Sequence, residues 1–398
     1  METITRPAAG GAVVFEVDGL WQRLAALRDA RRARGTRYPL PLVLRLIVLA
    51  KLGGEDTPSG IADWVAHRRA ALGQALGQAL GQALPRTPHH NTYRRVLEGA
   101  VDPHELDAAV GAVFRARPEV GHSVLVSIDG KTVRGTIDAP ATRGAHLLAA
   151  YLPAEGIVLM QVAAGDKANE ISAAPALLRC LDLRGKVVAG DALHTQRALS
   201  AQILDAGGDY LWVAKDNQPT LRADIEAVFT ADDRTVAGGR IERDLRSART
   251  VEKGHGRQET RVLTASDDLA GYSDWPGLAQ VFRLERHRLH TKSGKHEQEV
   301  IYGLTSLSSA AVSAARLLAL QRAYWGIEHG LHHRRDATFH EDGTRLTRGH
   351  AGRVMATLNN LVIGLLRAAG HTNLAAARRR CDADLLASLA LLAPPLRL

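Results

Sequence analysis

The chain has 398 residues, 45% of them hydrophobic and 23% charged, which is typical of a folded globular protein rather than a disordered or fibrous one. Lys and Arg number 51 against 42 Asp and Glu, and the formal net charge of +9 suits a nucleic-acid partner or reflects an arginine-biased composition. The two cysteines, Cys180 and Cys381, are too few for a disulfide framework or a four-thiolate zinc site.

Neither a targeting sequence nor a membrane span is predicted. The first residues lack the basic and apolar regions of a signal peptide. The most apolar stretch, residues 38–54, is interrupted by Arg45 and Lys51 and is shorter than the ~20 residues that cross a bilayer. We therefore expect a cytoplasmic protein with no membrane segment.

Residues 1–118 are predicted to form a helical N-terminal domain. A buried helix is expected over 40–52, and the tandem ALGQ repeat of 71–82 places a leucine at every fourth position, which suits one face of a helix. The segment 85–99 places a turn before a short basic helix, as a helix-turn-helix unit does. This pattern is weak evidence that the N-terminal domain contacts DNA.

From residue 119 the pattern changes to strands, because apolar residues begin to alternate with polar ones. The expected order is three strands, a helix, a strand, a helix and a strand, which predicts a layered α/β domain. In chain order these elements are 122–132, 144–153, 156–167, 169–185, 186–195, 195–208 and 209–219.

The rest of the chain is expected to complete this domain around an insertion. Residues 222–305 read as strands joined by polar turns and predict a β-rich insertion. A long helix is expected from Ser308 to Asp336, because apolar residues recur along it at 3-4-3-4 spacing. The catalytic core would therefore comprise 119–221 and 306–370, followed by a helical tail over 371–398.

Three carboxylates lie where chemistry is expected. Asp129 and Asp191 each end a predicted strand, where open α/β sheets bind their ligands. Glu328 lies on the late helix beside its apolar stripe, so it could reach the same point. Clustered carboxylates fit two-metal phosphoryl transfer, in which Mg²⁺ ions ~3.5–4 Å apart clamp the attacking and leaving oxygens. Each acid taken alone is more often a solvated loop or capping residue.

The sequence around these acids resembles the ISAs-type family of insertion-sequence transposases, which is related to the H-repeat-associated proteins. Seven blocks match in order, and the helical segments near the N-terminus also look like this family. The blocks are VSIDGKTVRGT (126–136), GDKANEISAAPALL (165–178), VVAGDALHTQ (187–196), DYLWVAKDNQPTL (209–221), VEKGHGRQETR (251–261), YWGIEHGLHHRRDATFHED (324–342) and RGHAGRVMATLNNL (348–361).

The resemblance implies an α/β fold with an RNase H-like catalytic core of the DDE superfamily. It implies that Asp129, Asp191 and Glu328 are, in that order, the three catalytic acids and the ligands of Mg²⁺, for which Mn²⁺ can substitute. It also implies work as a homodimer or a larger assembly on paired DNA ends. The Tyr, Arg, Glu, Lys signature common in relatives is only partly present here, around Tyr324 and Arg335.

Further residues are candidates for contact with DNA, although each also has a structural reading. Arginine forks fit phosphate oxygens, a lysine after a turn can be a plain surface residue, and an aromatic side chain can stack on a flipped base or lie in the core. These candidates are Lys131, Lys215, Asn217, Arg322, Tyr324, Trp325 and Arg335. The histidines near Glu328 and His194 are expected to face DNA or solvent rather than zinc, which requires three or four tetrahedral ligands.

The sequence therefore predicts a transposase that binds terminal inverted repeats of double-stranded DNA in the bacterial cytoplasm, at the nucleoid. Water would cut the strand first, and the freed 3′-hydroxyl would then attack target DNA. Two alternatives stay open, namely a metal-dependent RNase H-like nuclease and a host-adopted, transposase-derived DNA-binding protein. A regulator with a decayed site is disfavoured because all three acids are present.

Overall fold

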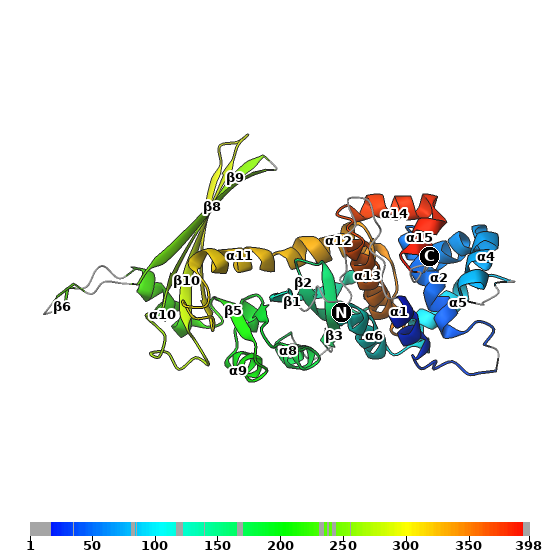
Figure 1. Ribbon diagram of the computed structural model, residues 1–398, viewed down its shortest axis with the longest axis horizontal. Coiled ribbons are helices and arrows are strands. Elements are labelled where there is room, and N and C mark those ends of the chain that lie inside the picture. The colour runs from blue at the N-terminus through cyan, green and yellow to red at the C-terminus, as the bar shows by residue number, and fades with distance from the viewer. Residues whose placement is uncertain are drawn as a thin grey trace, which may run out of the picture.

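The computed structural model describes residues 17–34, 36–80, 84, 86–116, 122–138, 140–164, 170–230, 235–236, 239–240, 244–254 and 256–392. It is a mixed α/β structure with one large sheet and a helical N-terminal region. The molecule is elongated: helices form one end, the sheet runs through the middle, and a raised pair of strands marks the other end (Figure 1). None of the described helices has the length and apolarity needed to cross a membrane.

The N-terminal region is helical, as expected. Its helices are α1 (Val17–Ala25), α2 (Leu40–Leu52), α3 (Pro58–His67), α4 (Arg69–Leu80), α5 (His90–Arg95) and α6 (Pro103–Arg115), with a π-helical turn at Val96–Ala100. Helix α2 is almost entirely buried because it is apolar on every face. Of the repeated leucines, Leu72, Leu76 and Leu84 are buried, whereas the side chain of Leu80 lies outside the described residues.

Capping residues fix where these helices begin. The side chain of Thr57 accepts a hydrogen bond from the backbone of Gly60, and Pro58 follows at the first position of α3. Asp102 caps α6 in the same way, again with a proline directly after it. Each capping side chain accepts from a backbone N–H that the first turn of a helix leaves without a partner. Proline fits directly after the cap because it has no N–H that would need one.

One nine-stranded sheet forms the body of the molecule, in the order β3-β2-β1-β4-β5-β11-β10-β9-β8. Strand β1 runs antiparallel to β2 and parallel to β4, and β4 runs parallel to β5. The strands are β1 (Leu125–Val133), β2 (Ala145–Leu152), β3 (Ile157–Ala164), β4 (Val187–Ala189), β5 (Asp209–Ala214), β8 (Arg246–Gly254), β9 (Arg257–Ser266), β10 (Gln280–His290) and β11 (His296–Thr305). A separate two-stranded hairpin pairs β6 (Thr235–Val236) with β7 (Gly239–Arg240).

The region expected as a β-rich insertion is continuous with the core sheet. Strand β11 pairs antiparallel with β5, from Tyr302 opposite Ala214 to Thr305 opposite Leu211. The antiparallel pairs β11–β10, β10–β9 and β9–β8 then extend the sheet into what we call the arm, made of β8 to β11. The first part of this region is helical instead, as α10 (Pro219–Thr230).

Helices cover both faces of the sheet. Helices α8 (Glu170–Arg179) and α9 (Arg197–Asp205) lie below it in Figure 1, and α11 (Ala314–Tyr324) runs above it from the arm toward β1. The expected single helix from Ser308 to Asp336 is wrong at its start and in its middle. Ser313 caps α11 and accepts from the backbone of Arg316, so the helix begins there. A π-helical turn over Glu328–His332 then separates α11 from α12 (His333–Ala337).

The C-terminal helices return to the N-terminal ones. Helix α13 (Ala351–Ala368) packs against α6 and β3, and α14 (Leu374–Ala383) and α15 (Leu385–Ala390) pack against α2. Trp64 Nε1 donates to Asp382 at 2.9 Å, and Trp21 Nε1 donates to the backbone of Leu392, also at 2.9 Å. The expected helical tail is therefore part of the helical end of the molecule, and residues 393–398 lie outside the described residues.

Candidate active site

Two of the three candidate acids lie at equivalent distances along neighbouring parallel strands: Asp129 is inside β1, rather than at its end as expected, and Asp191 lies two residues after the end of β4. Ser127 of β1 pairs with Ala189 of β4, and each acid follows two residues later along its strand direction, as Asp129 and Asp191. Side chains two residues apart on a strand point to the same side, so equivalent positions on paired parallel strands lie close together. Asp191 also caps the short turn that follows β4, because it accepts from the backbone of Leu193 at 2.9 Å.

Glu328 joins these two acids from a segment far along the chain. It begins the π-helical turn after α11, and its carboxyl contacts that of Asp129. Burial, followed by the negative charge of Asp129, raises the pKa of Glu328. Burial also raises the pKa of Asp191, with further contributions from Asp129 and Glu170 against the opposing effect of His194. The structure thus places all three predicted acids so close together that the charge of Asp129 raises the pKa of the other two.

The chemistry of these donors fits a hard cation. Carboxylate oxygens are the ligands that Mg²⁺ prefers, and mutual repulsion among carboxylates is relieved when a cation binds between them. Within the described ranges, however, no three His, Cys, Asp or Glu side chains come close enough together to hold one ion. The acids therefore lie near one another, but the described residues do not form a complete metal site.

The histidines near Glu328 and His194 were expected to face DNA or solvent, which the structure corrects for two of them: His194 is fully buried, and His332 is buried against the first acid. His332 Nε2 lies 3.1 Å from Asp129 Oδ2, and its side chain is only 7% exposed. His332 is four residues after Glu328, within the same π-helical turn. This i, i+4 spacing was visible in the sequence as a signal that the two side chains share a face.

A fourth carboxylate, Glu170, lies beside the three acids and was also missed. His146 Nε2 lies 2.9 Å from Glu170 Oε1, and His194 Nε2 lies 3.2 Å from Glu170 Oε2. The ring nitrogens of the fully buried His194 form no aligned hydrogen bond, so its approach to Glu170 is a close contact without hydrogen-bond geometry. Glu170 is partly buried, yet the two histidines outweigh the effect of burial and lower its pKa to about 2.

Two glycines make room for this cluster. A Cβ atom at Gly130 would lie 2.2 Å from Glu170 Oε1, and one at Gly190 would lie 2.9 Å from Cδ2 of His194. Each glycine directly adjoins a candidate acid, after Asp129 and before Asp191. The sequence therefore needs glycine at both places so that Glu170 and His194 can pack against the strand ends.

Tyr324 lies in the interior next to the acids. Its side chain is 8% exposed, and burial, followed by Asp129, Asp191 and Glu328, raises its pKa. The hydroxyl therefore stays protonated at neutral pH. Tyr324 was predicted as a DNA contact on the glutamate helix, and the structure places it close to the acids rather than on the open surface.

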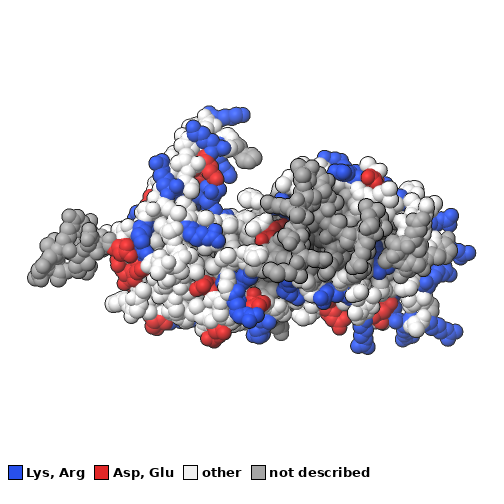
Figure 2. Space-filling view, viewed as in Figure 1, with Lys and Arg blue, Asp and Glu red and all other residues white. Residues whose placement is uncertain are grey.

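Trp325 and Arg322 face the arm. Trp325 is 42% exposed, so the alternative that it is a core residue is wrong, and the guanidinium of Arg286 lies 5.5 Å from its ring centre. Arg322 is ion-paired with Glu252 of β8. A pocket of about 270 Å³ lies between the helix and the arm, and both residues line it. Figure 2 shows basic side chains along the raised strands of the arm.

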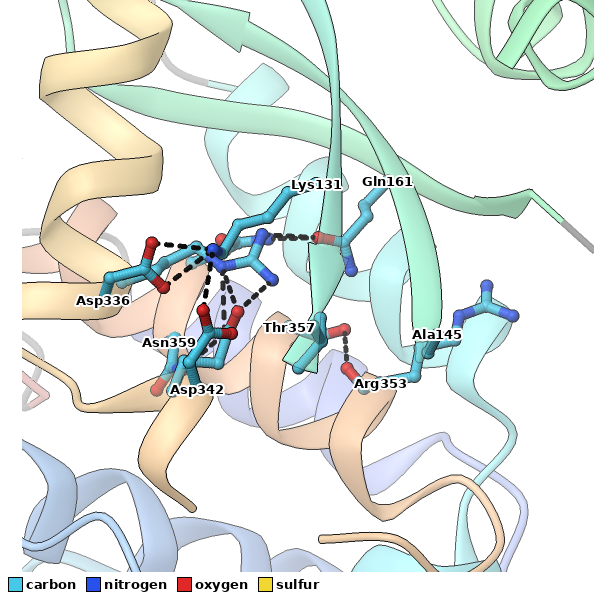
Figure 3. Close-up of polar contacts among 12 residues, drawn as sticks. Lys131, Ala145, Gln161, Asp336, Asp342, Arg353, Thr357 and Asn359 are labelled. Atoms are coloured by element: carbon cyan, nitrogen blue, oxygen red, sulfur yellow. Dashed lines mark hydrogen bonds and ion pairs between the residues drawn. The ribbon is translucent and has the colours of Figure 1, made fainter. Parts of the chain in front are cut away.

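Lys131 and Arg335 are instead held inside the protein. Figure 3 shows Lys131 pointing toward Asp336 and Asp342. Lys131 is 9% exposed and donates to Asp336 Oδ2 at 2.8 Å, with Asp342 3.9 Å away. Arg335 is fully buried, and its guanidinium donates to Glu341 at 2.7 Å and to Gln161 at 3.2 Å. The structure corrects the expectation that these two cations contact DNA, because both side chains are buried and are already ion-paired with carboxylates of the protein.

Lys215 and Asn217 follow β5, at the same end of the parallel strands as Asp191. Lys215 is exposed and lines a shallow pocket with residues of β11. The side-chain amide of Asn217 donates to the backbone of Ala192, directly after Asp191. Asn217 therefore supports the loop that carries the second acid, whereas Lys215 remains open to solvent.

The comparisons with known proteins cover nearly the same residues. The family model described as "Transposase DDE domain" matches residues 121–365, and the one described as "DDE_Tnp_1-associated" matches 21–113. The H repeat-associated putative transposase YhhI of Escherichia coli is 28% identical over 88% of this chain and 91% of its own. An uncharacterized protein in the dhlA 3′ region of Xanthobacter autotrophicus is 34% identical over 65% of this chain and 85% of its own.

The similarity of this chain to a solved structure is weaker than its similarity to these sequences. The piggyBac transposase in its synaptic complex with hairpin DNA has a TM-score of 0.40 and 10% sequence identity, covering 96% of this chain and 81% of that one. A TM-score of this size supports no argument about the present chain.

Proposed function

Because this chain belongs to the family of the transposase DDE domain, we propose that it is a DNA transposase that cuts and joins DNA with Asp129, Asp191 and Glu328. It would bind the ends of its own element and act on double-stranded DNA in the bacterial cytoplasm. The observation that carries the proposal is the convergence of these three carboxylates, from two neighbouring strands and a distant helix, at one end of the parallel strands.

The strand topology supports an RNase H-like core. In such a core, three antiparallel strands are followed by two parallel ones, which corresponds here to the order β3-β2-β1-β4-β5. The acids then fall on β1, directly after β4, and on a helix that packs across β1. The arm extends this core at β5 and leaves the acid-bearing strand ends in place.

The three carboxylates would hold Mg²⁺, or Mn²⁺ in its place. Ions bound there would supply Lewis acidity to the reacting phosphate. The protein's own contribution is to hold Asp129 against His332 and to fix the loop after Asp191 through Asn217. Glu170, charged at neutral pH, would keep His194 next to Asp191.

The surface between α11 and the arm would receive DNA close to the acids. Trp325, with an exposed ring near Arg286, is positioned to stack on a base that has left the duplex. Arg322 and the exposed Lys215 would contact phosphates, and Tyr324 would donate its hydroxyl near the acids. Transposition joins two ends, so we expect a dimer or a larger assembly on DNA.

A cleavage and strand-transfer assay tests the proposal. The full chain is incubated with duplex DNA carrying the two ends of its element, in the presence of Mg²⁺, Mn²⁺ or Ca²⁺, and beside it the variant Asp129→Ala. We expect nicking and joining with Mg²⁺ and Mn²⁺, and neither with the variant. Intact DNA in the presence of a folded protein and Mg²⁺ would count against the proposal. Cleavage of any sequence without joining would favour a nuclease instead.

A further inference from the structure

A second basic surface lies at the helical end of the molecule. A cleft of about 550 Å³ opens between the loop 31–38 and the segment that contains α5, and the residues lining it include no aspartate or glutamate. We call it the arginine cleft. Its basic residues are Arg31, Arg32, Arg34, Arg37 and Arg95, with His89 beside them.

Hydrogen bonds hold the walls of the arginine cleft in place. Arg31 is ion-paired with Asp29 at 2.7 Å and donates to the backbone of Tyr38 at 2.9 Å. The Tyr38 hydroxyl donates to the backbone of Thr87 at 3.1 Å, which ties the loop to the segment before α5. These contacts fix the shape of the arginine cleft, because Arg31 holds the loop on which the other loop arginines lie.

The remaining arginines of the cleft are not neutralised. Arg32, Arg34, Arg37 and Arg95 are exposed, and none has an ion-pair partner among the residues that the structure describes. The arm differs in this respect, since three of its arginines are each paired with two or more glutamates: Arg261 with Glu252 and Glu259, Arg286 with Glu259 and Glu299, and Arg288 with Glu259, Glu297 and Glu299. Much of the arm's positive charge is therefore already balanced within the protein, whereas that of the cleft is available to a ligand.

The side chains that line the arginine cleft indicate which class of ligand it binds. Guanidinium groups form paired hydrogen bonds with phosphate oxygens, and several exposed cations in a row match the regular phosphates of a nucleic-acid backbone. The described lining offers no asparagine or glutamine, the side chains that read adenine edges. Such a surface binds the backbone regardless of sequence, and it positions the duplex rather than selecting it.

We propose that the arginine cleft is a second DNA-binding site, which holds the phosphate backbone of the same duplex whose end lies at the three acids. This rests on the proposed function and adds a site remote from the chemistry. The cleft is lined by the loop before α2 and by α5, whereas the acids belong to β1, the turn after β4 and the turn between α11 and α12. Figure 1 shows α2 and α5 at the helical end and β1 and α12 nearer the middle of the molecule. DNA contacting both would run along the molecule from the helical end to the centre.

The scaffold keeps the two sites at a set separation. The segment carrying α5 continues into the π-helical turn Val96–Ala100, where Glu98 accepts from the backbone of His350 at 2.9 Å. His350 directly precedes α13, which packs against β3 of the sheet. Gly349 lies so close to Glu98 that an added Cβ would be 2.2 Å from its carbonyl oxygen, and Gly349 has φ +54°. The cleft is therefore coupled to the acid-bearing sheet through tight backbone contacts.

Charge reversal in the full chain tests this second site. The triple variant Arg32→Glu, Arg34→Glu, Arg37→Glu leaves Arg31 and its loop contacts intact. The matched control, Arg179→Glu, Arg184→Glu, Arg197→Glu, changes the net charge by the same amount on α8, on the turn between α8 and β4, and on α9. Binding of a 40-base-pair duplex is followed by fluorescence anisotropy over a series of KCl concentrations, with thermal unfolding as a check on folding.

We expect the cleft variant to bind at least tenfold more weakly and to release fewer counterions. The slope of log K against log[KCl] should fall by about 0.9 for each phosphate that the variant no longer touches, and the weakening should be the same for end-sequence and random duplex. The control should keep most of its affinity and its slope. An unchanged slope in a folded cleft variant would overturn the proposal, and so would an equal weakening in the control.

Two further measurements distinguish a DNA site from a site for another polyanion and from the catalytic acids. If the cleft variant keeps duplex DNA binding but no longer binds double-stranded RNA or anionic vesicles, the surface serves another polyanion and the proposal is wrong. The variant Asp129→Ala should keep the wild-type affinity and salt slope. If that variant still cuts DNA, the proposed catalytic function fails, while the salt-slope result continues to decide the arginine cleft on its own.

Discussion

His332 Nε2 lies 3.1 Å from Asp129 Oδ2, so the turn that supplies one candidate acid also holds the other. Glu328 and His332 are one turn apart on the same segment, and they approach Asp129 together. This places a neutral or positive partner next to a carboxylate that already faces like charge from Glu328. The contact orients the carboxylate of Asp129, which a metal ligand requires.

We therefore predict that His332→Ala slows strand cleavage by about 10- to 100-fold, the usual effect of losing a partner that orients a metal ligand. Single-turnover cleavage of end-sequence DNA measures the rate, and anisotropy measures binding, which should stay within about twofold. His332→Gln, which can still donate to Asp129, should recover part of the rate. Equal rates in the alanine variant and the wild type would refute an orienting role.

Glu170→Gln is expected to lower the cleavage rate as well. At neutral pH Glu170 is a carboxylate, since its contacts with His146 and His194 lower its pKa to about 2. A neutral amide cannot give both histidines a charged partner, so His194 next to Asp191 loses its support. The control Asp182→Asn alters an exposed acid paired only with Arg184, and it should leave cleavage unchanged. A rate for Glu170→Gln within twofold of wild type would show that the cluster has no role in the reaction.

Trp325→Ala should weaken the interaction with unpaired DNA without unfolding the protein. The ring is 42% exposed, so its removal costs little core packing. Stacking on a base contributes about 1–3 kcal/mol, and its loss predicts a roughly 5- to 100-fold lower affinity. Binding of DNA with an unpaired end base, compared with a fully paired duplex, checks this. A loss that is equal for both DNAs would contradict base stacking.

The stability of the protein should depend on pH through Asp107. Burial raises the pKa of Asp107 to about 7, from 3.8, despite hydrogen bonds from Thr357 and Arg353. The folded protein thus keeps a proton that the unfolded chain releases near pH 4. Stability from this group is therefore complete below pH 4 and is lost as the pH rises toward 7.

Replacing the Asp107 carboxyl by an amide isolates its contribution to the pH dependence of the unfolding free energy. The difference in unfolding free energy between Asp107→Asn and the wild type should grow in favour of the variant as the pH rises from about 4 to 7. One pKa unit corresponds to about 1.4 kcal/mol, so the change should be on the order of 1 kcal/mol or more. Urea unfolding at several pH values measures it. A difference that does not change with pH would rule out a raised pKa at Asp107.

Asp56→Ala should strongly destabilise the helical end. Asp56 accepts from Lys51 at 2.8 Å and from Arg378 at 2.9 Å, and all three side chains are buried. Its removal leaves two buried cations without a counter-charge, which costs about 3–5 kcal/mol. Asp216→Ala, which breaks the exposed ion pair with Arg222, should cost about 0–1 kcal/mol by the same urea measurement. Similar losses in both variants would contradict the importance of burial.

The local pattern of the sequence predicted much of the fold. Alternating residues around Val126 and Ile128 and the helices that follow lie where they were expected, because strand and helix periodicity is a property of neighbouring residues. The three acids were also found in the sequence, and the structure brings them together. Their roles in catalysis remain predictions.

Contacts between distant residues could not be predicted in this way. The pairing of Tyr302 with Ala214 joins the arm to the core sheet, and no local pattern specifies it. Arg335 was expected to face DNA because its partners were unknown, and one of them, Gln161, lies 174 residues away in the chain. Glu170 was missed because only the fold brings it to His146 and His194.

The pairing of β11 with β5 also has a consequence for shortened forms of the protein. In the full chain, β5 is an interior strand with hydrogen-bonded neighbours on both sides, β4 and β11. Removal of the arm would turn β5 into an edge strand, with a row of open backbone donors and acceptors along a buried apolar segment. Such edges pair readily with other chains. A version trimmed to strands β1 to β5 and their helices would therefore be expected to aggregate, because the arm covers the edge of β5 in the full chain.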